Sequence, residues 1–194
     1  MKKFLIILLV LFYPSIKSNA EEKNINRITV GSPDAKITII AYESLTCSHC
    51  ANFHKDVYPQ LKKDFLDTGL AKIEFRHFPL DLAAFNASKI SQCRNDGNAE
   101  VLISLFSNQQ KWVKGSSVQE ANKNLEKFLK EEGYNFEFEK CITDKQIEDF
   151  VLNDRIEGVK KYDVNGTPTI IINNKKFEKS LNYKNLKKTL EKLI

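Results

Sequence analysis

The chain has 194 residues, of which 42% are hydrophobic and 28% are charged, and its formal net charge is +5 at pH 7. This length fits a single domain with its own hydrophobic core. A charge of this size indicates no particular partner. Nucleic-acid binding has no support, because no cluster of Lys or Arg coincides with a recognition motif.

The first twenty residues have the pattern of a cleavable signal peptide. Met1-Lys2-Lys3 precedes an apolar run from Phe4 to Phe12, and a polar stretch then leads to Ala20. The apolar run is about half the ~20 residues that a membrane-spanning helix needs. We therefore expect cleavage after Ala20 and a soluble, exported product of residues 21–194. The alternative is an uncleaved membrane anchor.

Residues 37–77 have the pattern of a strand-helix-strand unit. Residues 37–42 are a nearly continuous apolar, β-branched run, which predicts a strand buried on both faces. Apolar residues then recur at helical spacing from Phe53 to Phe65, and Pro59 is expected to kink or restart that helix. Alternation over residues 73–77 predicts a second strand. The short polar stretch before the unit, residues 21–33, indicates an N-terminal lead-in.

The rest of the chain divides into a helical insert and a second strand-containing half. Residues 81–162 are predicted to be helical throughout, and Thr143 with Gln146 forms a capping-box pattern at the start of the last of these helices. Residues 169–172 predict a buried strand, after which Asn173-Asn174 predicts a tight hairpin turn. A final helix is expected over residues 183–193. The sequence therefore predicts one α/β domain, residues 21–194, with the insert at about 81–162.

The four cysteines of the predicted exported chain fall into two kinds. An even number of cysteines in an exported protein usually means disulfides. Cys47 and Cys50 are two residues apart, whereas Cys93 and Cys141 lie far from them and from each other. The simplest pairing gives one local bond and one long structural bond, which would stabilise the fold by roughly 4 kcal/mol. A second redox couple at Cys93 and Cys141 is the alternative.

Two motifs and their order resemble the DsbA-like branch of the thioredoxin superfamily. They are Cys47-Ser48-His49-Cys50 after a buried strand and, beyond the helical insert, the run of residues 164–169, Val-Asn-Gly-Thr-Pro-Thr, before a second buried strand. The likeness covers essentially all of the predicted exported chain and implies a thioredoxin-like fold. It further implies that Cys47 is the exposed nucleophile, Cys50 the buried resolving thiol, and Pro168 a cis-proline facing them. The backbone at Thr167 would then pair with an extended substrate segment.

The expected position of the cysteine pair agrees with these roles on physical grounds. The pair lies where a strand turns into a helix, and a helix N-terminus favours a thiolate through its free N–H groups and its dipole. Cys47, at the very start, gains most, and His49 can add a donor or a charge near the sulfur. A stabilised reduced form makes the disulfide a stronger oxidant. This chemistry needs no cofactor.

Glu43 departs from the family pattern. The acidic residue that the family often has six positions before its first cysteine is replaced here by Ala41, and Glu43 follows two residues later on the same face of the strand. Glu43 is therefore a candidate proton acceptor for Cys50, with an exposed carboxylate as the alternative. His54 and His77 are candidate metal ligands or bases, but lone histidines are more often surface or satisfied core residues.

The leading functional prediction is a periplasmic disulfide oxidase. Its expected partners are exported proteins with free thiols and an unidentified redox partner that reoxidises the pair, for which a membrane protein is one candidate. The chain is expected to be a monomer. The nearest alternative is an isomerase or reductase of the same fold, although residues 21–33 are too short for the dimerising region of family isomerases. A protein that holds copper(I) through Cys47, Cys50 and His49 is a third hypothesis.

Signal cleavage can be tested on the exported protein. We expect its mass to correspond to a chain that begins at Glu21, because the short apolar run ends before small residues that suit a signal peptidase. Mass spectrometry of the exported protein measures this mass. A product that still carries Met1 would contradict the predicted cleavage.

Overall fold

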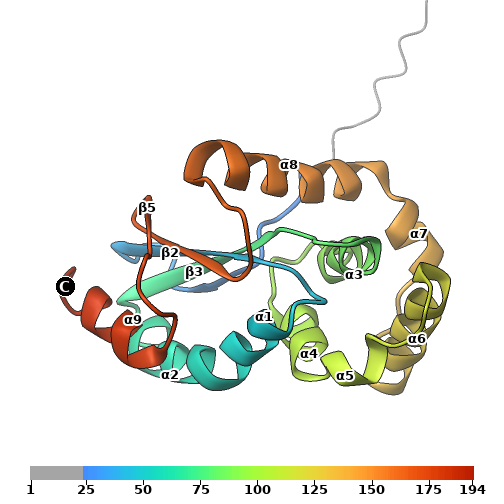
Figure 1. Ribbon diagram of the computed structural model, residues 1–194, viewed down its shortest axis with the longest axis horizontal. Coiled ribbons are helices and arrows are strands. Elements are labelled where there is room, and N and C mark those ends of the chain that lie inside the picture. The colour runs from blue at the N-terminus through green and yellow to red at the C-terminus, as the bar shows by residue number, and fades with distance from the viewer. Residues whose placement is uncertain (1–23) are drawn as a thin grey trace, which may run out of the picture.

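The computed structural model describes residues 24–194, so the predicted signal peptide and its cleavage site lie outside the described residues. A five-stranded mixed sheet forms the centre of the fold (Figure 1). Its strands, in spatial order, are β1 (Thr29–Gly31), β3 (Ala71–His77), β2 (Ile37–Glu43), β4 (Thr169–Ile172) and β5 (Lys175–Lys176). Neighbouring strands β2 and β3 run parallel, and the other pairs are antiparallel.

The edge strand β1 corrects one sequence prediction. Residues 21–33 were expected to be a lead-in, yet Thr29–Gly31 pair with β3 in the register Thr29↔Glu74. Ile28, which precedes the strand, is buried in the core. Three residues are too few to display a strand period, so the pairing partner rather than the local pattern defines this strand.

The sheet places the start of β4 beside the end of β2. Antiparallel pairing of these strands sets Tyr42 opposite Thr169, so the segment that precedes β4 lies next to the loop that follows β2. The turn between β4 and β5 is the predicted hairpin, and Asn173 and Asn174 adopt positive φ angles of 45° and 64°. Paired residues with positive φ suit a two-residue hairpin connection.

The helix after β2 consists of four short segments: α1 (Ser48–Asn52), the π-helical η1 (Phe53–Val57), α2 (Tyr58–Leu61) and the π-helical η2 (Lys62–Leu66). Pro59 lies in the first turn of α2, where its missing N–H costs least. The expected restart at this proline is therefore confirmed. The π-helical turn before Pro59 holds more residues than an α-helical turn, so it shifts which of the side chains after Cys50 face the core.

Between β3 and β4, every regular element of the described chain is a helix, as predicted for residues 81–162. These are α3 (Leu82–Gln92), α4 (Glu100–Ser107), α5 (Gln109–Trp112), α6 (Val118–Glu131), α7 (Phe138–Thr143) and α8 (Lys145–Tyr162). The capping box expected at Thr143 is wrong by one residue, because Thr143 ends α7. Asp144 caps α8 instead, and its carboxylate accepts hydrogen bonds from the backbone N–H groups of Gln146 and Ile147.

Helices cover both faces of the sheet (Figure 1). Helix α8 crosses one face, while α1, α2 and the last helix, α9 (Tyr183–Leu190), lie on the other. Alternate residues of β2 enter two cores: Ile39 and Ala41 belong to the larger one, and Ile40 and Tyr42 pack under α8. The strand is therefore buried on both faces, as its continuous apolar run predicted.

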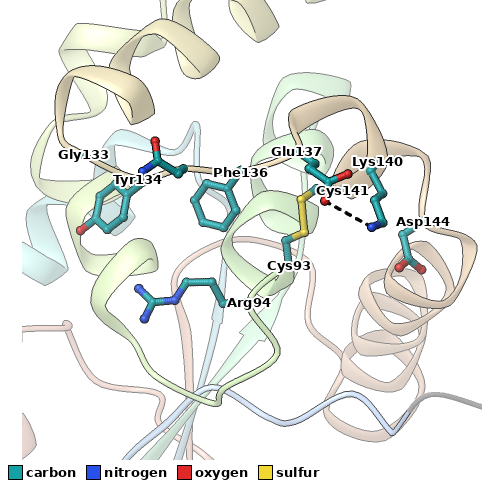
Figure 2. A pocket seen from close by; sticks show the side chains of 10 residues that line it. Cys93, Arg94, Gly133, Tyr134, Phe136, Glu137, Lys140, Cys141 and Asp144 are labelled. Atoms are coloured by element: carbon teal, nitrogen blue, oxygen red, sulfur yellow. Dashed lines mark hydrogen bonds and ion pairs between the residues drawn. A yellow bond between two sulfur atoms is a disulfide. The ribbon is translucent and has the colours of Figure 1, made fainter.

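A disulfide joins Cys93, which follows α3, to Cys141 in α7, with their Cα atoms 5.6 Å apart. This is the long pairing that the sequence favoured. Figure 2 shows that the bond lies beside Phe136 in the wall of an open cavity of about 480 Å³. Closing a loop of 48 residues stabilises the fold by about 4 kcal/mol in the chain-entropy model.

Gly158 lets α8 lie directly against the sheet. A Cβ atom at this position would lie 2.8 Å from Cε1 of Tyr42, whose side chain is fully buried. We expect Gly158→Ala to lower the free energy of unfolding by about 1–2 kcal/mol, because overpacking outweighs the gain in helix propensity. Urea denaturation monitored by circular dichroism measures the loss.

The matched control is Gly166→Ala, where an added Cβ would meet nothing within 4 Å. We expect this change to stay within about 0.5 kcal/mol of the unaltered chain. Equal urea midpoints for the two variants would show that Gly158 does not set the distance between α8 and the sheet.

Candidate active site

The two vicinal cysteines lie at the N-terminus of α1, directly after the loop that follows β2. Cys47 is the N-cap residue, with an extended backbone conformation, and Cys50 is one turn further on. The thiols of Cys47 and Cys50 are both free in this structure. The turn before α1 is closed by a hydrogen bond of 3.0 Å from the backbone N–H of Cys47 to the carbonyl of Ser44. This geometry directs unpaired helix N–H groups toward the sulfur of Cys47.

The thiol of Cys47 is half-buried and acidic. A hydrogen bond from the Cys50 thiol, together with those from Thr167 and from the backbone N–H groups of Cys50 and His49, lowers the pKa of Cys47 from 9.0 to about 5, although burial opposes this. Cys47 is therefore a thiolate at neutral pH and is protonated as the pH falls through about 5. The ring of His49 is exposed, and its contribution comes through its backbone N–H.

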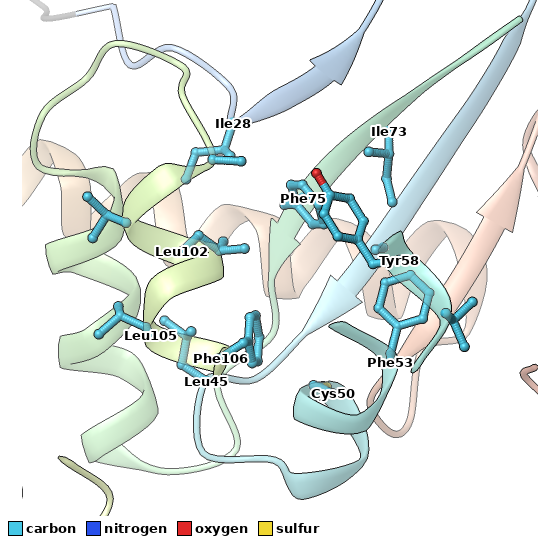
Figure 3. Packing of buried hydrophobic residues seen from close by; sticks show 14 of the residues in the cluster. Ile28, Leu45, Cys50, Phe53, Tyr58, Ile73, Phe75, Leu102, Leu105 and Phe106 are labelled. Atoms are coloured by element: carbon cyan, nitrogen blue, oxygen red, sulfur yellow. The ribbon is translucent and has the colours of Figure 1, made fainter. Parts of the chain in front are cut away.

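Cys50 has the opposite environment. Its side chain is fully buried among Phe53 and other core residues (Figure 3). Burial raises the pKa of the Cys50 thiol far above its ordinary value, and the charges of Glu43 and Cys47 add to the effect. The two thiols therefore differ in both accessibility and acidity, so that one can attack while the other stays protonated.

The Thr167-Pro168 peptide bond is cis, the isomer that the family resemblance implied. When Cys47 is protonated, its thiol donates a hydrogen bond of 3.4 Å to the carbonyl of Thr167. The segment before β4 therefore contacts the reactive sulfur directly. Pro168 also lines an open groove of about 640 Å³, together with His49, Phe53 and Tyr183. Thr167, whose carbonyl contacts Cys47, also lines the groove, which is large enough to receive part of a side chain or peptide.

Glu43, at the end of β2, is buried and has 4% of its surface exposed. The alternative of an exposed carboxylate is therefore wrong. Nε2 of His54 lies 2.9 Å from Oε2 and 3.1 Å from Oε1 of the carboxylate. Burial raises the pKa of Glu43, contact with His54 opposes the rise, and the charge of Cys47 adds to it. A carboxyl group with a raised pKa beside a reacting thiol can exchange protons with it.

His54 is a buried residue bonded to Glu43, a contact that the sequence did not predict. It is 5% exposed and stacks on Phe106 with 4.2 Å between the ring centroids. A local signal existed, because His54 follows Cys50 by four residues, which is one helical turn. By contrast, His77 is a satisfied core residue whose Nε2 lies 3.2 Å from Oε1 of Gln92. Burial lowers the pKa of His77.

Gln109 connects the helical insert to the active-site loop and was also missed. Its side-chain amide donates hydrogen bonds of 2.8 Å to the carbonyl of Leu45 and 3.1 Å to the carbonyl of Cys47. No local pattern could have identified it, because more than 60 residues separate it from these partners. These two hydrogen bonds hold the backbone of the loop that carries Cys47.

A metal site and a membrane span were sought among residues 24–194. No group of three or more His, Cys, Asp or Glu in this part of the chain is placed to hold a metal ion. Across the same residues, the helices lack the length and apolar character needed to cross a bilayer.

Comparison with known proteins agrees with this geometry. The family model described as Thioredoxin matches residues 23–192. Disulfide bond formation protein D of Bacillus subtilis is 28% identical over 173 residues, which cover 84% of this chain and 75% of that protein. A relative from Rickettsia bellii is 27% identical over 152 residues. The chain spans only 53–62% of the length of this relative and two others from Rickettsia.

Solved structures show the same fold. The crystal structure of Wolbachia pipientis alpha-DsbA1 matches with a TM-score of 0.77 and 28% identity, covering 88% of this chain and 92% of that one. Oxidised BdbD from Bacillus subtilis matches with a TM-score of 0.70 and 22% identity, and this likeness supports the fold alone.

The acidity of Cys47 is expected to depend on Gln109. Replacing it by glutamate removes both amide donors and adds a negative charge beside the thiolate. We expect Gln109→Glu to raise the pKa of Cys47 by on the order of one unit. Ultraviolet absorbance of the thiolate, titrated with acid, measures the change.

Gln110→Glu is the matched control, because it adds the same charge at an exposed position of the same helix. We expect Gln110→Glu to leave the midpoint near 5. If both variants shift the midpoint equally, the effect is a general charge effect and Gln109 has no specific role.

Proposed function

This chain belongs to the thioredoxin family, and we propose that it is an exported thiol-disulfide oxidoreductase that forms disulfide bonds in other proteins. The resemblance to DsbA-like proteins and the thioredoxin-like fold are confirmed. The observation that carries the proposal is the asymmetry of the two thiols, since Cys47 is accessible and acidic while Cys50 is buried and weakly acidic. Cys47 and Cys50 are proposed to alternate between a disulfide and a dithiol.

The proposed cycle consists of two thiol-disulfide exchanges. A substrate thiolate attacks the sulfur of Cys47 in the Cys47–Cys50 disulfide, a mixed disulfide forms, and Cys50 leaves as a thiolate that takes up a proton. A second substrate thiolate then attacks the substrate sulfur of the mixed disulfide and releases Cys47 as a thiolate. The substrate has lost two electrons and gained one disulfide, and the protein pair has been reduced.

The low pKa of Cys47 favours the oxidase direction. A thiol that is readily ionised is a good leaving group, and its thiolate stabilises the reduced protein. Both effects drive electrons from the substrate to the protein. An isomerase or reductase would use the same atoms but would need a less oxidising pair.

Substrate proteins are proposed to bind at the groove beside Cys47. The chain segment at Thr167 and Pro168 faces the reactive sulfur, and its backbone could pair with an extended peptide. Apolar and polar side chains, among them Phe53 and Tyr183, line the groove. Such a mixture suits unfolded segments of varied sequence better than a single small ligand.

Glu43 is proposed to act as the proton acceptor for Cys50. It is buried, its pKa is raised, and its charge is close enough to raise the pKa of Cys50. A weakly acidic buried thiol needs such a base whenever it must become a nucleophile. The predicted signal peptide supports action in the periplasm on exported proteins, with a separate redox partner that reoxidises Cys47 and Cys50.

The redox potential of the Cys47–Cys50 pair tests the proposal. We expect equilibration against a glutathione buffer to give a potential well above the thioredoxin level of about −270 mV, because the thiolate stabilises the reduced form. Quantification of free thiols by mass spectrometry measures the equilibrium. A potential at or below the thioredoxin level would indicate a reductase.

Three variants test the separate roles of the cysteines. Replacing Cys93 and Cys141 together by alanine removes the second disulfide, and the measured potential should remain oxidising. Cys47→Ala should abolish the oxidation of a reduced substrate protein. Cys50→Ser lacks the resolving thiol, so attack of its Cys47 thiolate on oxidised glutathione should leave a stable mixed disulfide at Cys47 and release reduced glutathione. Unchanged oxidation by the Cys47 variant would exclude the proposed mechanism.

A further inference from the structure

We propose that His54 is a positioning residue for proton transfer at Cys50, because its Nε2–H holds the Glu43 carboxylate in place and stabilises it after the carboxylate has given up its proton. The inference rests on the proposed thiol-disulfide exchange and on the role proposed for Glu43. His54 does not touch the reacting sulfur atoms. It acts through Glu43.

The geometry leaves the His54 ring little freedom. The ring stacks on Phe106 with an interplanar angle of 14° and 4.2 Å between centroids. Phe53, Tyr58 and Phe75 contribute further rings, with centroids 5.4–5.5 Å from that of His54 for each. These aromatic side chains, some of which Figure 3 shows, come from the helix after β2, from β3 and from α4. The imidazole is therefore held with one nitrogen directed at Glu43.

Both carboxylate oxygens are within reach of the same nitrogen. Nε2 of His54 lies 2.9 Å and 3.1 Å from the two oxygens, and both side chains are almost fully buried. Either oxygen can accept the Nε2–H while the other carries or accepts a proton. At a buried position, such a donor favours the ionised carboxylate and so counteracts the effect of burial on Glu43.

Nδ1 of His54 is buried and has no hydrogen-bond partner among the described residues. A histidine retained only for packing and hydrogen bonding would be expected to satisfy both ring nitrogens. Of the two ring nitrogens, only Nε2 has a partner, so Nε2 is the nitrogen placed to donate to Glu43.

The proton transfer balances in both directions. When Cys50 leaves as a thiolate, protonated Glu43 gives it a proton, and the products are the Cys50 thiol and a carboxylate bonded to Nε2–H of His54. When Cys50 must attack a mixed disulfide at Cys47, the carboxylate takes the proton back. Without the imidazole donor, the effect of burial would be unopposed and the pKa of Glu43 would rise further, so less of the carboxylate would be available to take the proton back.

The titratable groups around Glu43 and His54 are Cys47 and Cys50 at α1, Tyr58 on α2, and His77, which pairs with Glu43 in the β2–β3 ladder. Burial raises the pKa of Tyr58 to about 12, so this group stays neutral near neutral pH. The pKa of Cys47 is about 5, and its sulfur does not titrate in the mixed disulfide. The groups left to titrate in the resolving step include Glu43 and Cys50 itself, so we assign to Glu43 only a midpoint that disappears in Glu43→Gln.

The test is the pH dependence of the rate at which Cys50 resolves a mixed disulfide between Cys47 and glutathione. In the unaltered protein, this rate should rise with pH as Glu43 ionises. His54→Phe keeps a planar ring but removes the donor, so the midpoint should move to higher pH by at least one unit. The rate below the midpoint should fall about tenfold. His54→Gln retains an N–H donor and should restore most of the rate.

The Glu43→Gln variant distinguishes the role of Glu43 from that of His54. The midpoint should disappear in this variant, and His54→Phe should then have little additional effect on the rate. An unshifted midpoint in His54→Phe, or a loss in His54→Gln as large as in His54→Phe, would overturn the inference. The Cys47–Cys50 potential is measured on the same variants. An oxidising potential with an unshifted midpoint refutes the role of His54 alone, whereas a reducing potential refutes the proposed oxidase.

A measurement on the unaltered protein avoids any dependence on variants that fail to fold. Nitrogen-15 NMR of labelled histidine should show a proton on Nε2 of His54 in both redox states. A proton on Nδ1 together with a bare Nε2 would contradict the inference, because such a ring could not stabilise the carboxylate.

Discussion

The site depends on the junction between β2 and α1, which places two identical side chains in opposite surroundings. Cys47 caps a helix and receives its N–H groups, while Cys50 is buried one turn later against the core. A thiol pKa falls where donors face the sulfur and rises where water is excluded. A spacing of three residues is therefore enough to give two thiols of different acidity and exposure. The rest of the fold holds this junction in place.

The sheet supplies the second half of the site. Antiparallel pairing of β2 with β4 brings Thr167 and Pro168 to the reactive sulfur, although about 120 residues separate them along the chain. The helical insert provides a third support through Gln109, and the disulfide between Cys93 and Cys141 links α3 to α7 within that insert. The insert is therefore part of the active-site architecture as well as a cover for the core.

Burial of Glu43 beside His54 shows how an altered strand sequence can keep a buried acid near the pair. The two-residue displacement from Ala41 leaves the carboxylate on the same face of β2, where the helix after α1 supplies an imidazole partner. A carboxylate at this depth would be costly without such a donor. The partner residue is therefore as much a part of the site as the acid.

The sequence by itself determined the features that have short-range or strongly periodic signals. The strand predicted at residues 37–42, the restart at Pro59, the helical insert, the hairpin at Asn173-Asn174 and the cysteine pair at a helix start all follow from local residue types. Two motifs in the right order also indicated the family. Local pattern failed at β1, whose three residues are too few for a period, and at the cap of α8, where Thr143 and Asp144 both offer a capping oxygen.

Only the tertiary structure decided which distant groups meet. The burial of Glu43 and its contact with His54 depend on how the helix after β2 packs against β3 and α4, and the bonds from Gln109 depend on the position of α5. Hydrogen bonds and desolvation act over a few ångströms in space, whatever the separation along the chain. The sequence could therefore name the reacting cysteines, but the groups that set their protonation became identifiable only once the chain was folded.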